Sequence, residues 1–385
     1  NQMTPMEELP FSKPDRPQSI VNAMTEHQAT MDALRGGVVN PTLSRIPECP
    51  EERARHLKSF GYFCDASMVG IAPLLPEAHL EQPKSNPDID QLAEELDTKK
   101  VKSLASGVDM IMADLKECLT TLRRGIDDHH TAIVFLYEMP RDPRPGEAGY
   151  DWLVGAQAHR ACLRSSETAV VIAAYLRLLG WDAKAHTATS TEFDLDRLAV
   201  SAGLAHIVEG RPSNPFVGSR FGVAAVTTTL DLAHDEPLAP PEQQGWLRTR
   251  APLWWIGART AKSAFARDPF ANRDFELGPH PFETIKRVDA PTTYIDEVNV
   301  ARVPKRTDMF ARAQFGDLGK AVKDEAEGGR FVQKAAPSMA QRGLLGAFML
   351  FQDGQPAAEK TENSAKQNAA NVKAASYFLG IDAVG

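Results

Sequence analysis

Apolar side chains recur at spacings of three and four residues in several stretches of the chain, as in helices that bury one face. Shorter stretches are apolar throughout and rich in β-branched residues, which predicts buried strands. Helices are expected over residues 51–63, 108–122, 165–179 and 195–205, and strands over residues 66–72, 131–137, 181–188 and 220–229. Because helices and strands alternate, the pattern predicts a layered α/β (α+β) domain.

The helix expected over residues 165–179 carries signals at both of its ends. Ser165 is a suitable N-cap, and Glu167 falls in the first turn, where the helix dipole favours a negative charge. Gly180 is the residue type that ends helices in a left-handed conformation. These signals set the expected bounds of this helix.

Prolines divide the rest of the chain. Residues 1–50 hold seven prolines, which interrupt helices, so we interpret this segment as an extended N-terminal arm. Residues 239–361 contain aromatic segments between prolines, including Trp254 and Trp255, and are expected to form a connector that wraps onto another domain. The layered domain is therefore expected over residues 51–238.

Composition and charge narrow the class of protein. The 385 residues carry a net charge of −8, which disfavours a nucleic-acid partner. No stretch reaches the roughly 18 apolar residues that span a bilayer. The four cysteines lack Cys-x-x-Cys spacing, which is typical of free thiols in a reducing compartment and argues against zinc or iron–sulfur ligation by this segment. We expect a cytoplasmic location.

Several polar residues could carry chemistry, but each has a simpler explanation. The Asp-Asp-His-His run at residues 127–130 is typical of a solvated loop before a strand, whereas a metal site needs three or four convergent ligands. His159, His186 and His206 follow no ligand spacing and are expected to be surface or core histidines. No phosphate-binding glycine loop is present.

Three acidic residues alternate near the start of the helix expected over residues 195–205. Glu192, Asp194 and Asp196 could suggest paired carboxylates for acid–base chemistry. Capping and the helix dipole are the better explanation for acids at such a position. We therefore expect a structural role for all three.

The end of the chain repeats a segment near its start. Residues 54–70 read ARHLKSFGYFCDASMVG, and residues 369–385 read AANVKAASYFLGIDAVG, which aligns without a gap at an offset of 315 residues. Any two helix–strand units that each bury one helix face share such a pattern. The other interpretation is that a second, catalytic copy of the domain begins near residue 362 and is cut at residue 385, so that the protein continues.

Longer stretches carry a family likeness. Residues 62–74 read YFCDASMVGIAPL, residues 166–210 contain a long helix, a strand and a short helix, and residues 220–237 read RFGVAAVTTTLDLAHDEP. Together with residues 280–297 they resemble, in order and spacing, the soluble catabolic cobalamin-dependent reductive dehalogenases, and more distantly the epoxyqueuosine reductases. The resemblance covers roughly half of the chain.

The resemblance implies a nitroreductase-like domain of the cobalamin-binding type. For the complete protein it implies removal of halogen from organohalides, halogenated aromatics or phenols, with cobalamin, two [4Fe–4S] clusters and an electron-donor reductase. This sequence departs from the family after residue 237, where APPEQQGWLRTRAPLWW stands in place of a cysteine-rich segment. Thiolates hold such clusters. The chain thus resembles a degenerate, non-catalytic N-terminal half, whose partner is the C-terminal catalytic half of the same protein.

Two questions stay open at the level of sequence. Phe282 lies in the lead-in to the family's catalytic core, where it could line a pocket for a halogenated aromatic, although aromatic residues commonly serve in packing between domains. No residue of this segment is assigned a catalytic, cofactor-binding or metal-binding role. The alternatives for the chain are a standalone nitroreductase-like module that binds corrinoid or flavin without iron–sulfur clusters, and a purely structural scaffold.

Overall fold

A computed structural model describes residues 20–98, 108–122, 125–147, 149–239, 303–327, 362–381 and 383–385, with isolated positions between 286 and 341. The first part of the described chain contains α1 (Ile20–Ala33), α2 (Pro50–Phe63), β1 (Met68–Pro73), β2 (His79–Lys84), α3 (Asp88–Thr98), α4 (Val108–Thr121) and β3 (Thr131–Glu138). Then follow α5 (Tyr150–Leu153), α6 (Gln157–Leu179), β4 (Ala183–His186), β5 (Thr191–Phe193), α7 (Leu195–Ser201), β6 (His206–Val208), β7 (Arg211–Ser213) and β8 (Phe221–Thr228). Three later helices are α10 (Met309–Phe315), α11 (Lys320–Glu327) and α13 (Ala365–Phe378).

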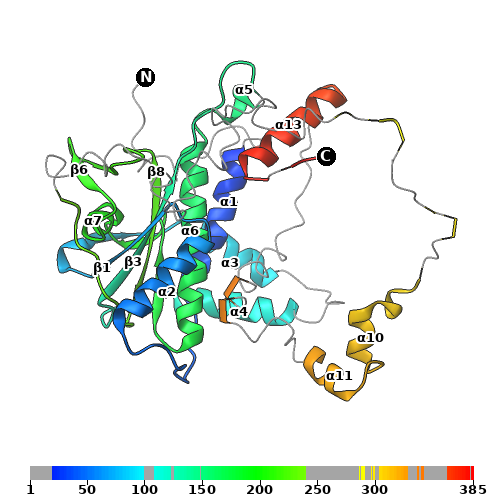
Figure 1. Cartoon of the computed structure of the whole chain (residues 1–385), viewed down its shortest axis with the longest axis horizontal. Helices are drawn as coiled ribbons and strands as arrows, with labels where there is room; N and C mark the ends of the chain where they lie inside the picture. Colours follow the sequence, from blue (N-terminus) through cyan, green and yellow to red (C-terminus); the bar gives the residue numbers. More distant parts are fainter. Residues whose placement is uncertain are drawn as a thin grey trace.

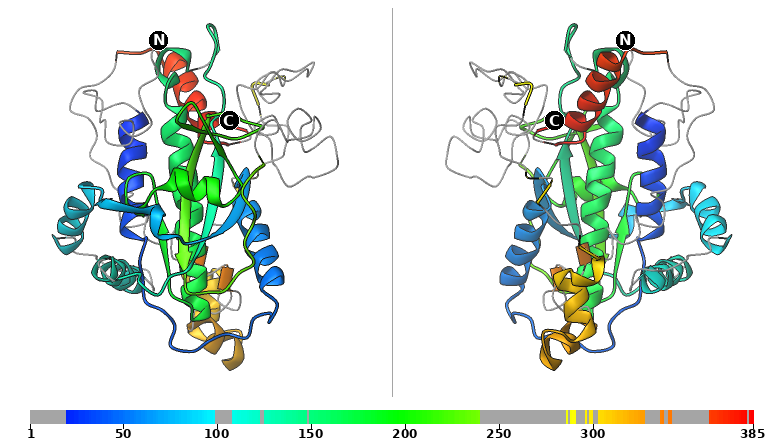
Figure 2. Two further views of the ribbon diagram at one scale, coloured as in Figure 1. Left: turned by 90° about the vertical axis from the view of Figure 1, so that its left-hand side faces the viewer. Right: turned by 90° about the vertical axis from the view of Figure 1, so that its right-hand side faces the viewer.

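A four-stranded antiparallel sheet forms the centre of the fold, in the order β1-β3-β8-β4. The register places Ile133 of β3 between Ile71 of β1 and Val226 of β8. Helix α6 runs along one face of the sheet between α1 and α2, and α7 covers the other face (Figures 1 and 2). The predicted layered mixture of helices and strands is confirmed, with all strands of this sheet antiparallel.

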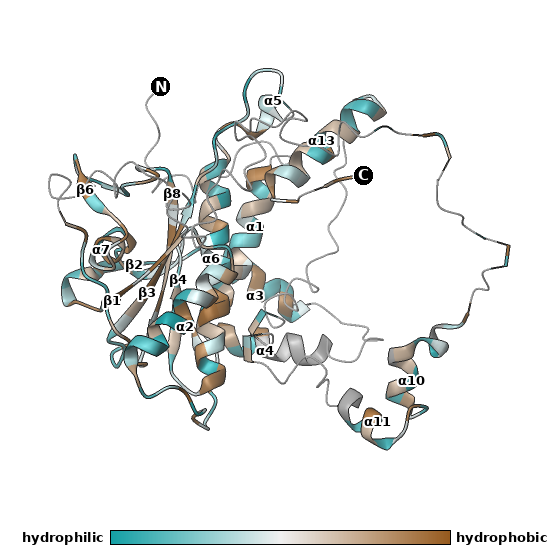
Figure 3. Ribbon diagram, viewed as in Figure 1, coloured by the Kyte–Doolittle hydropathy of each residue, from teal (hydrophilic) through white to brown (hydrophobic). Residues whose placement is uncertain are grey.

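Each face of the sheet packs into its own apolar core. Phe135 and Val226 belong to the core on the α6 side, and Val134 and Ala225 to the core on the α7 side. Figure 3 shows the central strands as largely hydrophobic, while α2 also carries polar residues. Strands buried on both faces read as continuous apolar runs, which is why the sequence pattern located β3 and β8 closely. None of the described helices has the length and apolar character that crossing a membrane requires.

Helix α6 begins eight residues before the expected start. Ser165 is therefore no N-cap, and that prediction is wrong: the residue is buried inside the helix, where its hydroxyl donates to the Cys162 carbonyl at 2.8 Å. Residues 157–164 contain no proline or glycine, so no residue in this stretch prevents the helix from starting as early as Gln157. The predicted end is confirmed, because Gly180 adopts a left-handed φ of 99°.

The expected extended arm contains a helix. Pro17 precedes α1 and the next proline is Pro41, so a helix can lengthen between them. Helix α1 packs against α6, with Met24 and Met31 in the main core. A side-chain hydrogen bond of 3.1 Å from Gln28 to Ser166 joins the two helices. Residues 20–33 are thus part of the packed layer beside α6.

Replacing Gly222 by alanine is expected to lower the free energy of unfolding by about 1–3 kcal/mol. Helix α6 lies so close to β8 that a Cβ at Gly222 would stand 2.7 Å from backbone atoms of Ala161 and Cys162. Gly125→Ala is the control, because that Cβ would meet only Asp127, at 3.4 Å. Urea unfolding of both variants tests this, and equal stabilities would contradict the close packing of helix and strand.

Candidate functional site

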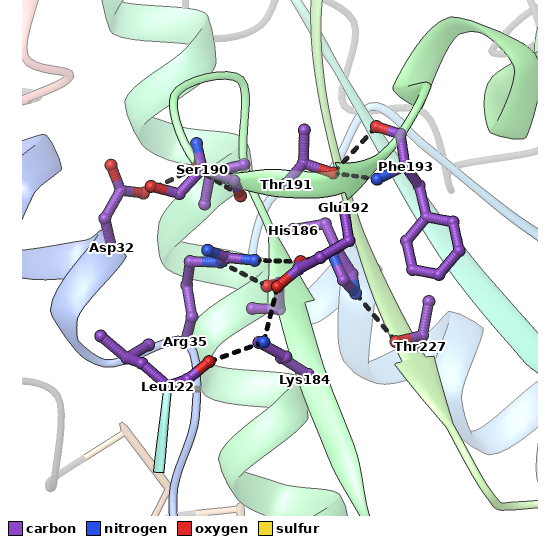
Figure 4. A network of polar contacts seen from close by, with 12 residues as sticks. Asp32, Arg35, Leu122, Lys184, His186, Ser190, Thr191, Glu192, Phe193 and Thr227 are labelled. Atoms are coloured by element: carbon purple, nitrogen blue, oxygen red, sulfur yellow. Dashed lines mark hydrogen bonds and ion pairs between the residues drawn. The ribbon is translucent and has the colours of Figure 1, made fainter. Parts of the chain in front are cut away.

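A group of polar and charged side chains lies mostly buried between α1 and the edge of the central sheet, and we call it the Glu192 cluster: Arg35, Lys184, His186 and Glu192 (Figure 4). Glu192 accepts hydrogen bonds of 2.6 Å from both Arg35 Nη2 and Lys184 Nζ. Its Oε2 also lies 3.0 Å from Nδ1 of His186, whose side chain is fully buried. The carboxylate thus has a cationic or hydrogen-bonding partner on three sides.

The strands explain this arrangement. Lys184 and His186 are alternate residues of β4, so their side chains leave the same side of the strand. Glu192 is the middle residue of β5, between Thr191 and Phe193, which are both buried. The short turn from β4 to β5 therefore brings the acid back over the two bases.

The electrostatics keep the Glu192 cluster in one protonation state. Burial would raise the pKa of Glu192, but hydrogen bonding to His186 and the charge of Arg35 outweigh it and hold the pKa well below its usual range. Burial lowers the pKa of His186 to about 4, against the attraction of Glu192, so its imidazole is neutral at pH 7. Burial likewise lowers the pKa of Lys184.

A second buried acid, Asp32 of α1, lies beside this cluster. Its Oδ1 accepts from Thr187 Oγ1 at 2.6 Å and from Gln28 Nε2 at 3.0 Å, and its Oδ2 accepts from Asn86 at 2.8 Å and from Thr189. Burial raises the pKa of Asp32, although these hydrogen bonds oppose the rise. Asp32 therefore holds together α1, the segment before α3 and the turn between β4 and β5.

A histidine pair extends the network into the sheet. Nε2 of His186 and Nδ1 of His129 each lie 2.8 Å from the hydroxyl of Thr227 on β8. His129 Nε2 is 3.8 Å from a carboxylate oxygen of Asp182. One hydroxyl thus links two buried imidazoles across neighbouring strands.

This arrangement fits a structural role better than acid–base chemistry. A general base needs a pKa near the working pH and access to substrate. Glu192 is instead held ionised by its partners, and His186 is neutral and fully buried. Each charged group of the Glu192 cluster contacts another member, so the cluster fixes α1 and β5 against the sheet.

The structure places the sequence candidates in different parts of the domain. Asp194 is the N-cap of α7 and accepts from the backbone N–H groups of Asp196 and Arg197, so its predicted capping role is confirmed. Glu192 is not part of that cap, and this prediction is wrong, because the strand before the helix turns its side chain into the buried cluster. His186 was expected as either a surface or a core histidine, and the structure places it in the core.

His159 and His206 lie at partly buried positions of α6 and β6. The run at residues 127–130 divides: His129 is buried against Thr227, whereas His130 is exposed and 2.7 Å from Asp231. The prediction of a solvated loop therefore holds for all of the run except His129. In the described part of the chain, no three His, Cys, Asp or Glu side chains converge as a metal site.

Sequence reasoning missed Asp32, Arg35 and Lys184. One signal was available for Lys184, because a lysine between Ala183 and Ala185 in a predicted buried strand needs a partner of opposite charge. Asp32 and Arg35 fell within the expected arm and had no such signal. Phe282, Trp254 and Trp255 lie outside the described residues.

The cysteines do not fit two [4Fe–4S] clusters. Such clusters take four thiolates each, whereas this chain has four cysteines in total. Cys49 and Cys64 flank the 14-residue helix α2, so their backbones stand roughly 20 Å apart. Burial raises the pKa of the Cys64 thiol to about 11 and that of Cys162 to about 12, which disfavours the thiolate that binds metal.

The two buried histidines of this network do not supply a ready cobalt ligand either. Imidazole nitrogen is the commonest protein ligand for transition metals. The ring of His186 contacts Glu192 and Thr227, and that of His129 contacts Thr227 through Nδ1. Both side chains are almost fully shielded from solvent, so neither ring presents a nitrogen at the surface to a bound corrinoid.

No protein-family model and no curated protein matches this sequence. Solved structures do match. The catabolic reductive dehalogenase NpRdhA is 32% identical with a TM-score of 0.73, and the match covers 96% of this chain and 47% of that one. A further reductive dehalogenase structure, described in connection with B12-dependent dehalogenation, matches with 31% identity and a TM-score of 0.72, over 97% of this chain and 49% of that one.

NpRdhA has also been solved in complex with 3-bromo-4-hydroxybenzoic acid, in a structure that matches with 31% identity and a TM-score of 0.73. Epoxyqueuosine reductase from Bacillus subtilis matches with 10% identity and a TM-score of 0.29, which is too low to carry an argument. The present chain spans about half the length of the dehalogenases that it matches. In sequence and fold, this chain is therefore similar over nearly its whole length to about half of a catabolic reductive dehalogenase, as its sequence resemblance predicted.

Proposed function

We propose that this chain is the non-catalytic N-terminal half of a reductive dehalogenase that removes halogen from organohalides. The observation that carries the proposal is the match to NpRdhA, at 32% identity over 96% of this chain but only 47% of the dehalogenase. The half of NpRdhA that the match does not cover is long enough for a second, catalytic domain. In this proposal residues 51–238 form the degenerate domain, residues 239–361 the connector and residues 362–385 the start of the catalytic copy.

The chemistry of this half supports a structural role. Its cysteines are too few and too scattered for two [4Fe–4S] clusters, and the carboxylate of Glu192 is bound to Arg35 and Lys184. In the complete protein, cobalamin would supply the reductive cleavage of the carbon–halogen bond and the clusters would supply electrons. The residues described above would keep the domain folded beside that catalytic half.

The substrate and partners are proposed at the level of chemical class. NpRdhA was crystallised with a brominated hydroxybenzoic acid. We therefore favour halogenated aromatics, phenols among them, as substrates of the complete protein. An electron-donor reductase would serve as its redox partner. Phe282 stays a candidate for the substrate pocket, and Phe282→Ala in the complete enzyme should weaken substrate affinity if that role is correct.

Metal analysis of the intact protein is the direct test. We expect about one cobalt and about eight iron atoms per polypeptide, because two [4Fe–4S] clusters hold four irons each. A variant with Cys49, Cys64 and Cys118 changed to serine and Cys162 to alanine should keep its full iron content. Iron lost in that variant would show that this half ligates a cluster. A mature protein of about 42 kDa without cobalt or iron would overturn the proposal.

A further inference from the structure

Helices α2 and α13 occupy equivalent positions in the internal repeat. Helix α2 spans Pro50–Phe63 and α13 spans Ala365–Phe378, so both are 14 residues long and both bounds differ by the 315 residues of the sequence offset. The internal repeat is therefore seen both in the amino-acid sequence and in the positions where the two helices begin and end.

The two helices nevertheless bury different faces. Helix α2 buries Ala54, Leu57 and Gly61 against β1 and α6. The approach to the sheet is close, because a Cβ at Gly61 would stand 2.7 Å from Val69 Cγ2 and 3.1 Å from the Phe135 ring. At the end of the helix Phe63 is 67% exposed. The inner face of α2 is thus the face that covers a sheet.

Helix α13 buries the opposite side, through Ala374, Tyr377 and Phe378. These residues pack beside α5 and the start of α6 (Figure 1). The Arg160 guanidinium stands 5.6 Å from the centre of the Phe378 ring, and a Cβ at Gly149 would lie 3.3 Å from that of Ala374. Phe378 is fully buried, although its counterpart Phe63 is exposed.

The face of α13 that corresponds to the inner face of α2 is open. Ala369, Val372, Ser376 and Leu379 stand where α2 and its C-cap have Ala54, Leu57, Gly61 and Cys64. Val372 is 62% exposed and Leu379 is 50% exposed, whereas Leu57 is 4% exposed. The hydroxyl of Ser376 donates to the Val372 carbonyl at 2.8 Å, so this face offers few free polar groups. We call it the outer face of α13.

We propose that α13 is a wall shared by two domains, whose outer face covers a second antiparallel sheet built like the sheet of β1 and β3. The inner face of α2 shows what such residues pack against, and the relatives are twice as long as this chain, which leaves room for that sheet. The inference rests on the proposed two-domain arrangement, but it does not depend on the activity. The occupant is the protein's own second domain, held through Val372 and Leu379.

Thiol labelling of the intact protein tests this inference without any need for bound metal. Val372→Cys and Lys366→Cys are compared by the rate of reaction with a maleimide, since Lys366 is exposed on another side of the same helix. The labelled site is identified by peptide mass, which separates it from the native cysteines. We expect cysteine at position 372 to react at least about tenfold more slowly than cysteine at position 366, because burial restricts thiol reactivity.

Three outcomes are informative. Slow labelling at position 372 that does not change with protein concentration supports a contact within one polypeptide. Equal rates at the two positions would overturn the inference. Protection that disappears on dilution would also overturn it, because the occupant would then be a second copy of the protein. A protein that contains cobalt and iron but labels equally at both sites would leave the proposed activity standing while refuting the shared wall.

Discussion

Glu192→Gln is expected to lower the free energy of unfolding by about 3 kcal/mol, the lower end of the range for breaking a buried ion pair. The substitution keeps the shape of the side chain but removes the charge that Arg35 and Lys184 both face at 2.6 Å. Those two cations then lose the carboxylate that both contact directly, while they remain in an environment of low dielectric constant. We take the lower end because a quarter of the Glu192 side chain reaches solvent.

Urea unfolding at pH 7, followed by circular dichroism, measures this change. Glu81→Gln is the matched control, because Glu81 lies on the neighbouring strand β2 but is exposed. We expect the control to stay within about 0.5 kcal/mol of the original protein. A similarly small change for Glu192→Gln would mean that the Glu192 cluster does not hold α1 and β5 in place.

Lowering the pH from 7 to 5 is expected to remove about 2 kcal/mol of stability through His186 alone. The pKa of His186 is about 4 in the folded protein, against the ordinary 6.5, chiefly because the ring is buried. Between these values the unfolded chain binds a proton that the folded chain does not. Stability therefore falls as the pH drops from about 6.5 towards 4.

Other groups in the network titrate lower or in the opposite sense. Glu192, with its lowered pKa, loses its stabilising contribution only below its unfolded pKa of 4.5. Asp32 has a raised pKa, so its contribution to the stability of the folded protein instead increases as the pH falls towards 3.8. Arg35 and Lys184 are the charges that face His186 and keep it neutral, against the attraction of Glu192.

The contribution of His186 is measured by comparing, between variants, the difference in unfolding free energy at pH 7 and pH 5. In His186→Gln this difference should shrink by about 2 kcal/mol, whatever the stability of the variant at pH 7. His56→Gln is the control, because the side chain of His56 is 65% exposed. An unchanged difference in the His186 variant would show that the imidazole binds its proton equally in the folded and unfolded states, which would contradict the lowered pKa.

The sequence pattern located the central sheet well because its strands are buried on both faces. Residues 131–137 and 220–229 were expected as strands and form the neighbouring strands β3 and β8. Strand β5 was missed because it has only three residues, too few for an alternation to show. The start of α6 was missed because a suitable N-cap residue, Ser165, lies within the helix. There its hydroxyl donates to the backbone carbonyl of Cys162 instead of capping the helix.

The candidate site was less accessible to sequence reasoning. One member of the Glu192 cluster lies far from the others in the chain, since Arg35 precedes its partner Glu192 by 157 positions. Only the tertiary fold brings such a pair together, so the local spacing of residues in the sequence could not predict this contact. Asp194 was placed correctly for the opposite reason, because capping depends on the next two or three residues alone.

The antiparallel sheet also determines the order in which this protein can be assembled during synthesis. Thr131 of β3 pairs with Thr228 of β8, and β4 reaches the sheet only through β8. At translation rates of about 5–20 residues per second, one edge of β3 waits roughly 5–20 s for its neighbour. Such non-local pairing slows folding and leaves an apolar strand edge open to other chains. The nascent domain therefore has a period of exposure to aggregation that ends when β8 leaves the ribosome.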